Sequence, residues 1–223
     1  MMVLQLSPAW NRSAIVALSL LTVVGAAPAA SAEATVQLTA PFTSEKSSSA
    51  ETSIGDLVAD ALRRAASVQV AFVDAEALQE INLPKGPARA SQFLTALSVP
   101  TDSVVVLTIK GDVLVAALER GVSNIPQPNP GFLQVSGLAY TLNTNARSGA
   151  RTETIVVNSK ALDKAASYTV AMPASLAQGA NGYFLVWPAR APSRTLPVHV
   201  GEALSQYLAE EPTLTPSTPR IIR

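Results

Sequence analysis

The sequence predicts an α/β fold with mixed β-sheets and packed helices. Helical and strand-like segments alternate in the first half of the chain, which is typical of α/β proteins. Three strand-like segments follow one another in the second half. Since consecutive strands usually pair antiparallel, the predicted sheet is mixed.

Apolar spacing defines the elements of the first half. Residues 51–65 carry an apolar stripe at helical spacing, with Ser53 as the predicted N-cap and two arginines at the end, where the helix dipole favours cations. The segments that follow are expected to be a buried strand at 67–73, a short helix at 91–97, a β-branched strand at 103–109 and a second helix at 112–122.

The second half is expected to contain three strands and a closing helix. Residues 132–142, 154–158 and 168–172 are rich in strand formers, and residues 200–210 have a helical pattern. The prolines between 124 and 130 mark a loop.

The ends of the chain have their own compositions. Residues 1–32 contain Arg12, no acid, the apolar stretch 14–24 and a final Ala-Ser-Ala, which is typical of a signal peptide; an uncleaved anchor is the alternative. We therefore expect an exported protein, periplasmic, in the cell envelope or extracellular, with no membrane span after cleavage. Residues 33–50 are interpreted as a Ser-rich linker, 51–210 as the folded domain and 211–223 as a Pro/Thr-rich tail.

Composition excludes several kinds of site. The 223 residues include no cysteine and one histidine, so cysteine-ligated metals, disulfides, thiol catalysis and sites with several histidines are excluded. Sixteen basic and sixteen acidic residues give a formal net charge of zero, which provides no global attraction for nucleic acid. The sequence predicts no cofactor, no metal site and no catalytic residue.

Motifs for catalysis are also absent. No G-x-S-x-G nucleophile turn, phosphate-binding P-loop or G-x-G-x-x-G segment occurs, and the single histidine, His199, is interpreted as a surface or partly buried side chain. Asp56 and Asp60 share a helical face and are interpreted as solvated charges or as members of weak ion pairs on the helix. Asp74 and the acids after it follow a buried strand, where α/β folds place ligand contacts.

Five segments together resemble one known family. They are Glu51 to Arg63 (ETSIGDLVADALR), Val105 to Val122 (with LTIKGDVL and ALERGV), Gly131 to Leu138 (GFLQVSGL), Tyr168 to Tyr183 (with YTVA and LAQGANGY) and Pro219 to Ile222 (PRII). In this order they resemble the C-terminal domain of 5′-nucleotidases. In that family this domain binds the nucleoside, and a separate N-terminal metallophosphoesterase domain cleaves the phosphate.

The resemblance implies a nucleoside site. Phe132 and Tyr183 would stand where two aromatic rings sandwich the base, and Asn181 where the family has an aspartate that holds the ribose hydroxyls. Gly182, the next residue, is a further candidate for substrate binding. The chain departs from the family at other positions. The family's N-x-G-G-x-R is here Asp74-Ala-Glu-Ala-Leu-Gln79, its L-P-F is Leu97-Ser-Val-Pro100, and the phenylalanine of F-L-A is Ser175.

Three hypotheses follow. The first is a nucleoside- or nucleotide-binding module, or the specificity half of an enzyme whose metallophosphoesterase is another chain. The second is a 5′-nucleotidase-type phosphoester hydrolase in nucleotide catabolism, acting alone or with a partner. The third is a degenerate structural or interaction domain in which Phe132 and Tyr183 belong to the core. With Gln79 in place of arginine and acids nearby, a neutral ligand is favoured over an anion.

Overall fold

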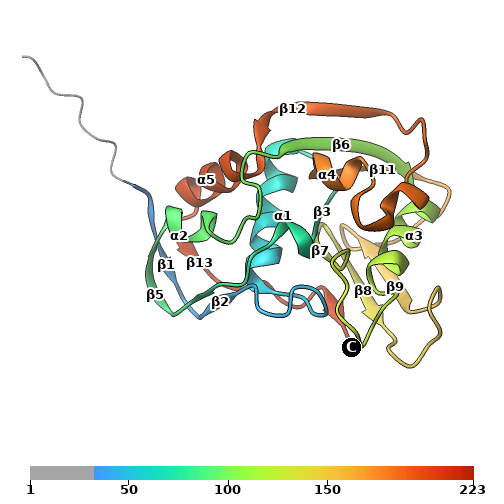
Figure 1. Ribbon diagram of the computed structural model, residues 1–223, viewed down its shortest axis with the longest axis horizontal. Coiled ribbons are helices and arrows are strands. Elements are labelled where there is room, and N and C mark those ends of the chain that lie inside the picture. The colour runs from blue at the N-terminus through green and yellow to red at the C-terminus, as the bar shows by residue number, and fades with distance from the viewer. Residues whose placement is uncertain (1–32) are drawn as a thin grey trace, which may run out of the picture. The chain divides into compact units, whose positions relative to one another are not determined.

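A five-stranded mixed sheet lies at the centre of the structure (Figure 1). The computed structural model describes residues 33–223; the predicted signal peptide lies outside the described residues and stays a prediction. The strand order is β12 (Ser193–His199), β6 (Ser103–Lys110), β11 (Ser167–Pro173), β3 (Val70–Asp74) and β7 (Leu133–Ser136). Within this sheet β3 and β11 run parallel, and the other neighbours are antiparallel. The fold class is therefore the predicted mixed α/β class.

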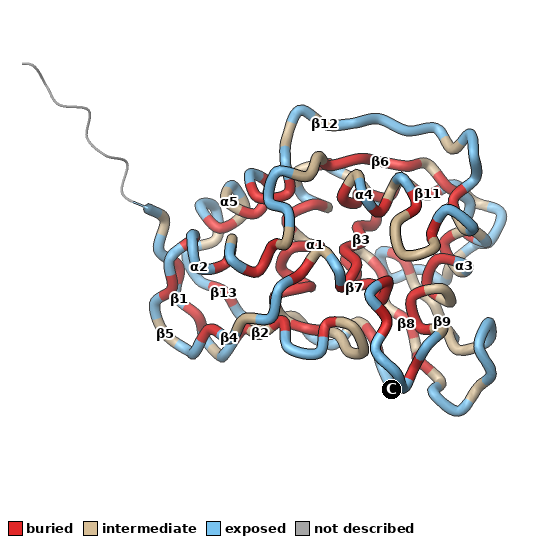
Figure 2. The backbone as a smooth tube through the Cα atoms, in the orientation of Figure 1, coloured by how far each residue is buried: buried red, intermediate tan, exposed pale blue. Residues whose placement is uncertain are grey.

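Both faces of the central sheet are covered. Along β3, Val70 and Phe72 pack into one apolar core, and Ala71 and Val73 pack into the other. This explains why β3, β6 and β11 are continuous apolar runs, since alternation disappears when both faces are buried. Figure 2 shows these strands as buried, whereas the edge strand β12 is mostly exposed.

Helices divide between the two cores. The first core contains α1 (Ser53–Ala66), α2 (Ala90–Leu94) and α5 (Val200–Glu210). The second contains α3 (Gly111–Gly121), α4 (Ala174–Ala177) and the 3₁₀ turn η2 (Ala180–Leu185). None of the helices between residues 33 and 223 has the length and apolar character needed to span a membrane.

Three smaller sheets flank the central one. They are β13 (Thr213–Leu214) with β1 (Thr35–Leu38) and β5 (Gly86–Arg89); β10 (Lys160–Ala161) with β9 (Thr152–Val157), β8 (Leu138–Leu142) and β14 (Ile221–Ile222); and β2 (Phe42–Thr43) with β4 (Asn82–Leu83). The predicted strand 132–142 is therefore two strands. The chain turns at Gly137, whose φ is 77° and where a Cβ would lie 2.0 Å from the carbonyl oxygen of Gln69.

The segments predicted as linker and tail are both part of the fold. β1 pairs antiparallel with β5 and parallel with β13, and β14 pairs parallel with β8. The serines do not form a linker, because Ser44 is fully buried and its hydroxyl donates to the carbonyl of Gln79 at 2.6 Å. Residues 33–223 accordingly form one compact unit, larger than the predicted domain at 51–210.

A buried glutamine joins α1 to the central sheet. Gln134 of β7 accepts from the Thr52 backbone amide at 2.8 Å and donates to the carbonyls of Ala50 and Ser47 at 2.8 and 3.0 Å. Thr52, and not the predicted Ser53, is the N-cap, with its hydroxyl accepting from Gly55 N. A Cβ at Gly55 would lie 2.4 Å from Gln134 Cγ, so the helix approaches the strand closely enough to require glycine.

A group of charges ties the C-terminal segment to α1. The Glu51 carboxylate accepts from the backbone amides of Arg220 and Ile221 at 2.7 and 2.9 Å. The Arg220 guanidinium forms an ion pair with Asp60 at 2.7 Å and lies 3.7 Å from Asp56. Asp56 and Asp60 are therefore not the solvated pair that was predicted, because residues 211–223 cover their face of the helix.

Asp56 is the more deeply buried of the two. Its side chain accepts a hydrogen bond from Ser217 and its residue is 5% exposed. Burial raises the pKa of Asp56 to about 8, and the neighbouring Glu51 adds to this effect while Arg220 opposes it. Asp56 is thus mostly protonated at neutral pH.

Replacing Gln134 tests the importance of the buried amide. We expect Gln134→Ala to lower the free energy of unfolding by about 2–4 kcal/mol, because it leaves the Thr52 amide and two carbonyls without partners. Urea denaturation followed by circular dichroism measures the change. Gln127→Ala, at an exposed glutamine in a loop, is the control, and an equal loss in both variants would contradict this role.

The pH dependence of stability tests the state of Asp56. Because its folded pKa of about 8 lies above that of the unfolded chain, Asp56 favours folding most at low pH, and this contribution is lost as pH rises toward 8. Asp56→Asn removes the titration. The stability of the variant relative to wild type should therefore rise between pH 5 and pH 8, by at most about 1.4 kcal/mol per pH unit. Denaturation at four pH values measures the slope, and a difference independent of pH would show that Asp56 is ionised throughout.

Candidate functional site

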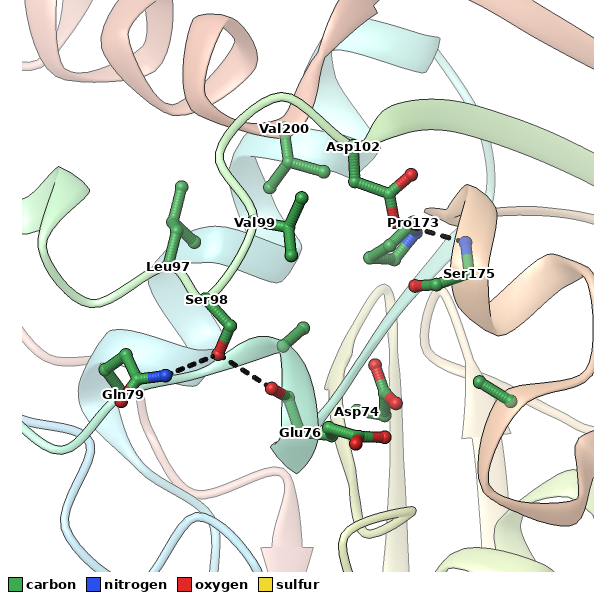
Figure 3. A pocket seen from close by; sticks show the side chains of 12 residues that line it. Asp74, Glu76, Gln79, Leu97, Ser98, Val99, Asp102, Pro173, Ser175 and Val200 are labelled. Atoms are coloured by element: carbon green, nitrogen blue, oxygen red, sulfur yellow. Dashed lines mark hydrogen bonds between the residues drawn. The ribbon is translucent and has the colours of Figure 1, made fainter.

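A cavity lies at the carboxyl ends of two inner strands of the central sheet. Because β3 and β11 are parallel, their carboxyl ends meet there, β3 at Asp74 and β11 at Pro173. α/β folds usually bind ligands beyond such strand ends. The cavity has a volume of about 490 Å³, in the range of small-molecule sites. Its lining is Asp74, Glu76, Ala77, Gln79, Leu97, Ser98, Val99, Asp102, Pro173, Ser175, Ala180 and Val200 (Figure 3).

Hydrogen bonds between the walls hold the cavity open. On one side, Gln79 donates from Nε2 to the Ser98 hydroxyl at 2.9 Å, and that hydroxyl donates to the Glu76 carbonyl at 2.8 Å. On the other side, the backbone amide of Ser175 donates to Asp102 at 3.1 Å. Gln79 lines the cavity, and its amide fixes the 97–100 loop.

Asp74 is the most deeply buried acid of the lining. Its residue is 2% exposed, its Oδ2 accepts from Asn181 Nδ2 at 2.6 Å, and its Oδ1 has no hydrogen-bond partner among residues 33–223. Burial raises the pKa of Asp74 to about 6; the hydrogen bond from Asn181 opposes this rise, and the negative charges of Glu76 and Asp102 add to it. The carboxylate is thus mostly ionised at neutral pH, and the hydrogen bond from Asn181 compensates only part of the cost of burying its charge.

The turn conformation and two hydrogen bonds from Arg120 fix the position of Asn181. Its backbone is left-handed, with φ at 56°, a region that asparagine tolerates better than most residues. Arg120 of α3 donates to the Asn181 carbonyl from Nε at 3.0 Å and Nη2 at 2.5 Å. Gly182 has φ at 84°, a left-handed conformation that favours glycine, and it does not line the cavity.

The cavity is acidic. Asp74, Glu76 and Asp102 contribute three carboxylates, and none of the described residues in the lining is lysine, arginine or histidine. Within residues 33–223 no three His, Asp or Glu side chains are close enough to hold a metal ion. A phosphate group would therefore be repelled here, whereas a neutral group would not be and a positive group would be attracted.

Sequence comparison decides the family. The model of the 5′-nucleotidase C-terminal domain matches residues 23–187. The chain belongs to this family. A curated relative is the trifunctional nucleotide phosphoesterase protein YfkN of Bacillus subtilis (strain 168), 27% identical over 142 residues, which are 60% of this chain and 10% of the relative.

Solved structures agree with the 5′-nucleotidase C-terminal fold. The 5′-nucleotidase precursor of Thermus thermophilus is 26% identical with a TM-score of 0.76, and the match covers 84% of this chain and 38% of that one. The NAD nucleotidase of Haemophilus influenzae is 14% identical with a TM-score of 0.72 over 84% of this chain and 37% of its own, which supports the fold alone. The chain thus spans well under half of these relatives.

The predicted aromatic clamp is wrong for this structure. Phe132 and Tyr183 are both 0% exposed and belong to the same apolar core. Tyr183 stacks on Trp187 with ring centroids 5.2 Å apart and donates its hydroxyl to the carbonyl of Gly131 at 2.7 Å. Burial raises the pKa of Tyr183 well above its ordinary value. Neither ring is available to a base, because each fills the space beneath its glycine-containing turn.

The family's structural motifs and the cavity involve mostly different residues, although Pro173 and Ala180 of one matching segment line the cavity. The matching segments supply Gln134, Glu51 and Tyr183, whose side chains hold elements together. By contrast, positions where this chain departs from the family pattern line the cavity: the Asp74–Gln79 turn, the 97–100 loop and Ser175. Asp102 was missed because no local pattern marks it. His199 lies outside the cavity lining, and its Nδ1 is 3.3 Å from Glu202.

A pair of phenylalanine variants tests the structural role of Phe132. We expect Phe132→Ala to lower the free energy of unfolding by about 3–5 kcal/mol, the usual result of a cavity in a core. Phe184→Ala is the matched control, because Phe184 is 68% exposed; it should change stability by less than about 0.5 kcal/mol. Thermal denaturation of both variants measures the difference. A stable Phe132→Ala protein would mean that the ring is not part of the core.

Proposed function

We propose that this domain is a small-molecule-binding module whose ligand is a nucleoside, bound in the cavity beside Asp74. One observation carries the proposal: the cavity at the carboxyl ends of β3 and β11 has polar groups on an otherwise apolar wall and no cationic side chain in its described lining. Leu97, Val99 and Val200 offer apolar contact to a base. Asp74 and Ser175 offer hydrogen bonds to sugar hydroxyls.

The relatives support a nucleoside rather than an unrelated ligand. The two relatives above 25% identity are named as a 5′-nucleotidase precursor and as a nucleotide phosphoesterase, and this chain corresponds to a part of each. A second candidate function is the specificity half of a nucleotidase whose metallophosphoesterase is a separate chain. The partial coverage of these relatives favours it, and it requires the same cavity.

Calorimetry with the purified full-length chain tests binding. We expect adenosine to bind and AMP to bind at least about tenfold more weakly, because three carboxylates face the cavity. Ser175→Leu, which projects a larger side chain at the cavity wall, should abolish binding, whereas Ser193→Leu on the exposed edge strand should not.

The outcomes separate the candidates. No heat with adenosine or any other nucleoside would contradict the binding proposal. Release of phosphate from AMP by this chain alone, with Mn²⁺ added, would favour a hydrolase instead. Release only after a metallophosphoesterase chain is added would support the specificity half.

A further inference from the structure

The free carboxylate oxygen of Asp74 distinguishes this cavity from the other buried acids. Three side-chain oxygens among the described residues are buried without a hydrogen-bond partner, one each on Asp56, Asp74 and Glu119. Native proteins satisfy nearly all such atoms, so each requires an explanation. Asp74 is the one of the three that lines the cavity, and Figure 3 shows its carboxyl group directed into the space between Glu76 and Ser175.

The neighbours of Asp74 supply no positive charge. Its one side-chain donor within residues 33–223 is the neutral amide of Asn181, and the charges acting on its titration are Glu76 and Asp102, both negative. Arg120 contacts Asn181, the partner of Asp74, but its Nε and Nη2 groups donate to the Asn181 carbonyl and not to the Asp74 carboxylate. Asp56 differs, because Arg220 lies 3.7 Å from its unpartnered oxygen.

The missing charge is best supplied by an organic cation. No three acidic or histidine side chains in residues 33–223 are close enough to bind a metal ion, so the carboxylates of this wall do not form a metal site. An ammonium group has three donors and can reach acceptors placed apart. We propose that the cavity selects a positively charged ligand, an amine of nucleoside size whose ammonium group pairs with the Asp74 carboxylate. This inference rests on the proposed function and specifies its ligand class.

A pair of ligands that differ in charge tests the inference. Calorimetry with the full-length chain at pH 7.5 compares adenosine with 5′-amino-5′-deoxyadenosine, in which an ammonium replaces one hydroxyl. We expect the amine to bind at least about tenfold more tightly than adenosine, because an ion pair in a partly buried site is only weakly screened.

Two variants and a control assign the preference to the cavity. Asp74→Asn keeps the size of the side chain and removes its charge, so the preference should fall to less than about threefold. Glu76→Gln, which neutralises an exposed acid of the lining, should reduce it partly. Glu45→Gln removes one exposed acid outside the cavity lining and should leave the preference unchanged.

The pH dependence provides a second measurement. The preference for the amine should decline from pH 7.5 to pH 5, because Asp74 becomes protonated while the ammonium group of the ligand stays charged. Equal affinity for adenosine and its amine at pH 7.5 would overturn the inference and leave the proposed function intact. An undiminished preference in folded Asp74→Asn would also overturn it. If neither compound binds, the proposed function itself fails.

Discussion

The buried side chain of Gln134 fixes the position of α1 on the central sheet, and most of the fold depends on this contact. Its amide hydrogen-bonds to the backbone at the start of α1 and to two carbonyls that precede the helix. These bonds fix the position of the helix along β7. Gly55 permits the close approach that these bonds require. With α1 in place, Glu51 and Asp60 face the C-terminal segment, and Arg220 joins them. The helix therefore organises both ends of the described chain.

The same network explains what family membership means for this chain. The conspicuous motifs contribute the buried amide, the paired carboxylates and the tyrosine beneath the η2 turn, all of which hold elements together. A sequence can keep these residues, and so keep the fold, while exposed positions of the cavity wall change. The likeness to nucleotidases is consequently strong evidence for the fold and weaker evidence for the ligand.

The sequence predicted those elements whose stability is local or follows from simple burial. The apolar stripe of α1 and the run 200–210 of α5 have clear helical spacing, and the apolar runs of β3 and β6 follow from burial on both faces. Residues 33–50 and 211–223 could not be assigned from sequence, because strands of two to four residues form only when distant partners meet, as Gln37 meets Thr213. The exposure of Phe132 and Tyr183 was mispredicted for a similar reason. A ring beside a glycine turn faces solvent or core according to what packs against it. Here Trp187 stacks on Tyr183, and Phe132 is buried in the same core.

The buried carboxylates beside α1 and the buried carboxylate of Asp74 differ in whether a cation of the chain lies next to them. Beside α1, Asp60 pairs with Arg220 and accepts a hydrogen bond from Ser136, and the more deeply buried Asp56 is mostly protonated, so neither acid carries an unpaired negative charge. At the end of β3, Asp74 is as deeply buried, yet the arginine nearest to its partner Asn181 binds a backbone carbonyl. Desolvating a carboxylate costs free energy that a protein normally recovers from a donor or a cation. The chain provides such a cation to Asp60, whereas Arg120 donates to a backbone carbonyl and not to Asp74. The uncompensated charge of Asp74 therefore marks the place where a bound ligand would recover the most free energy.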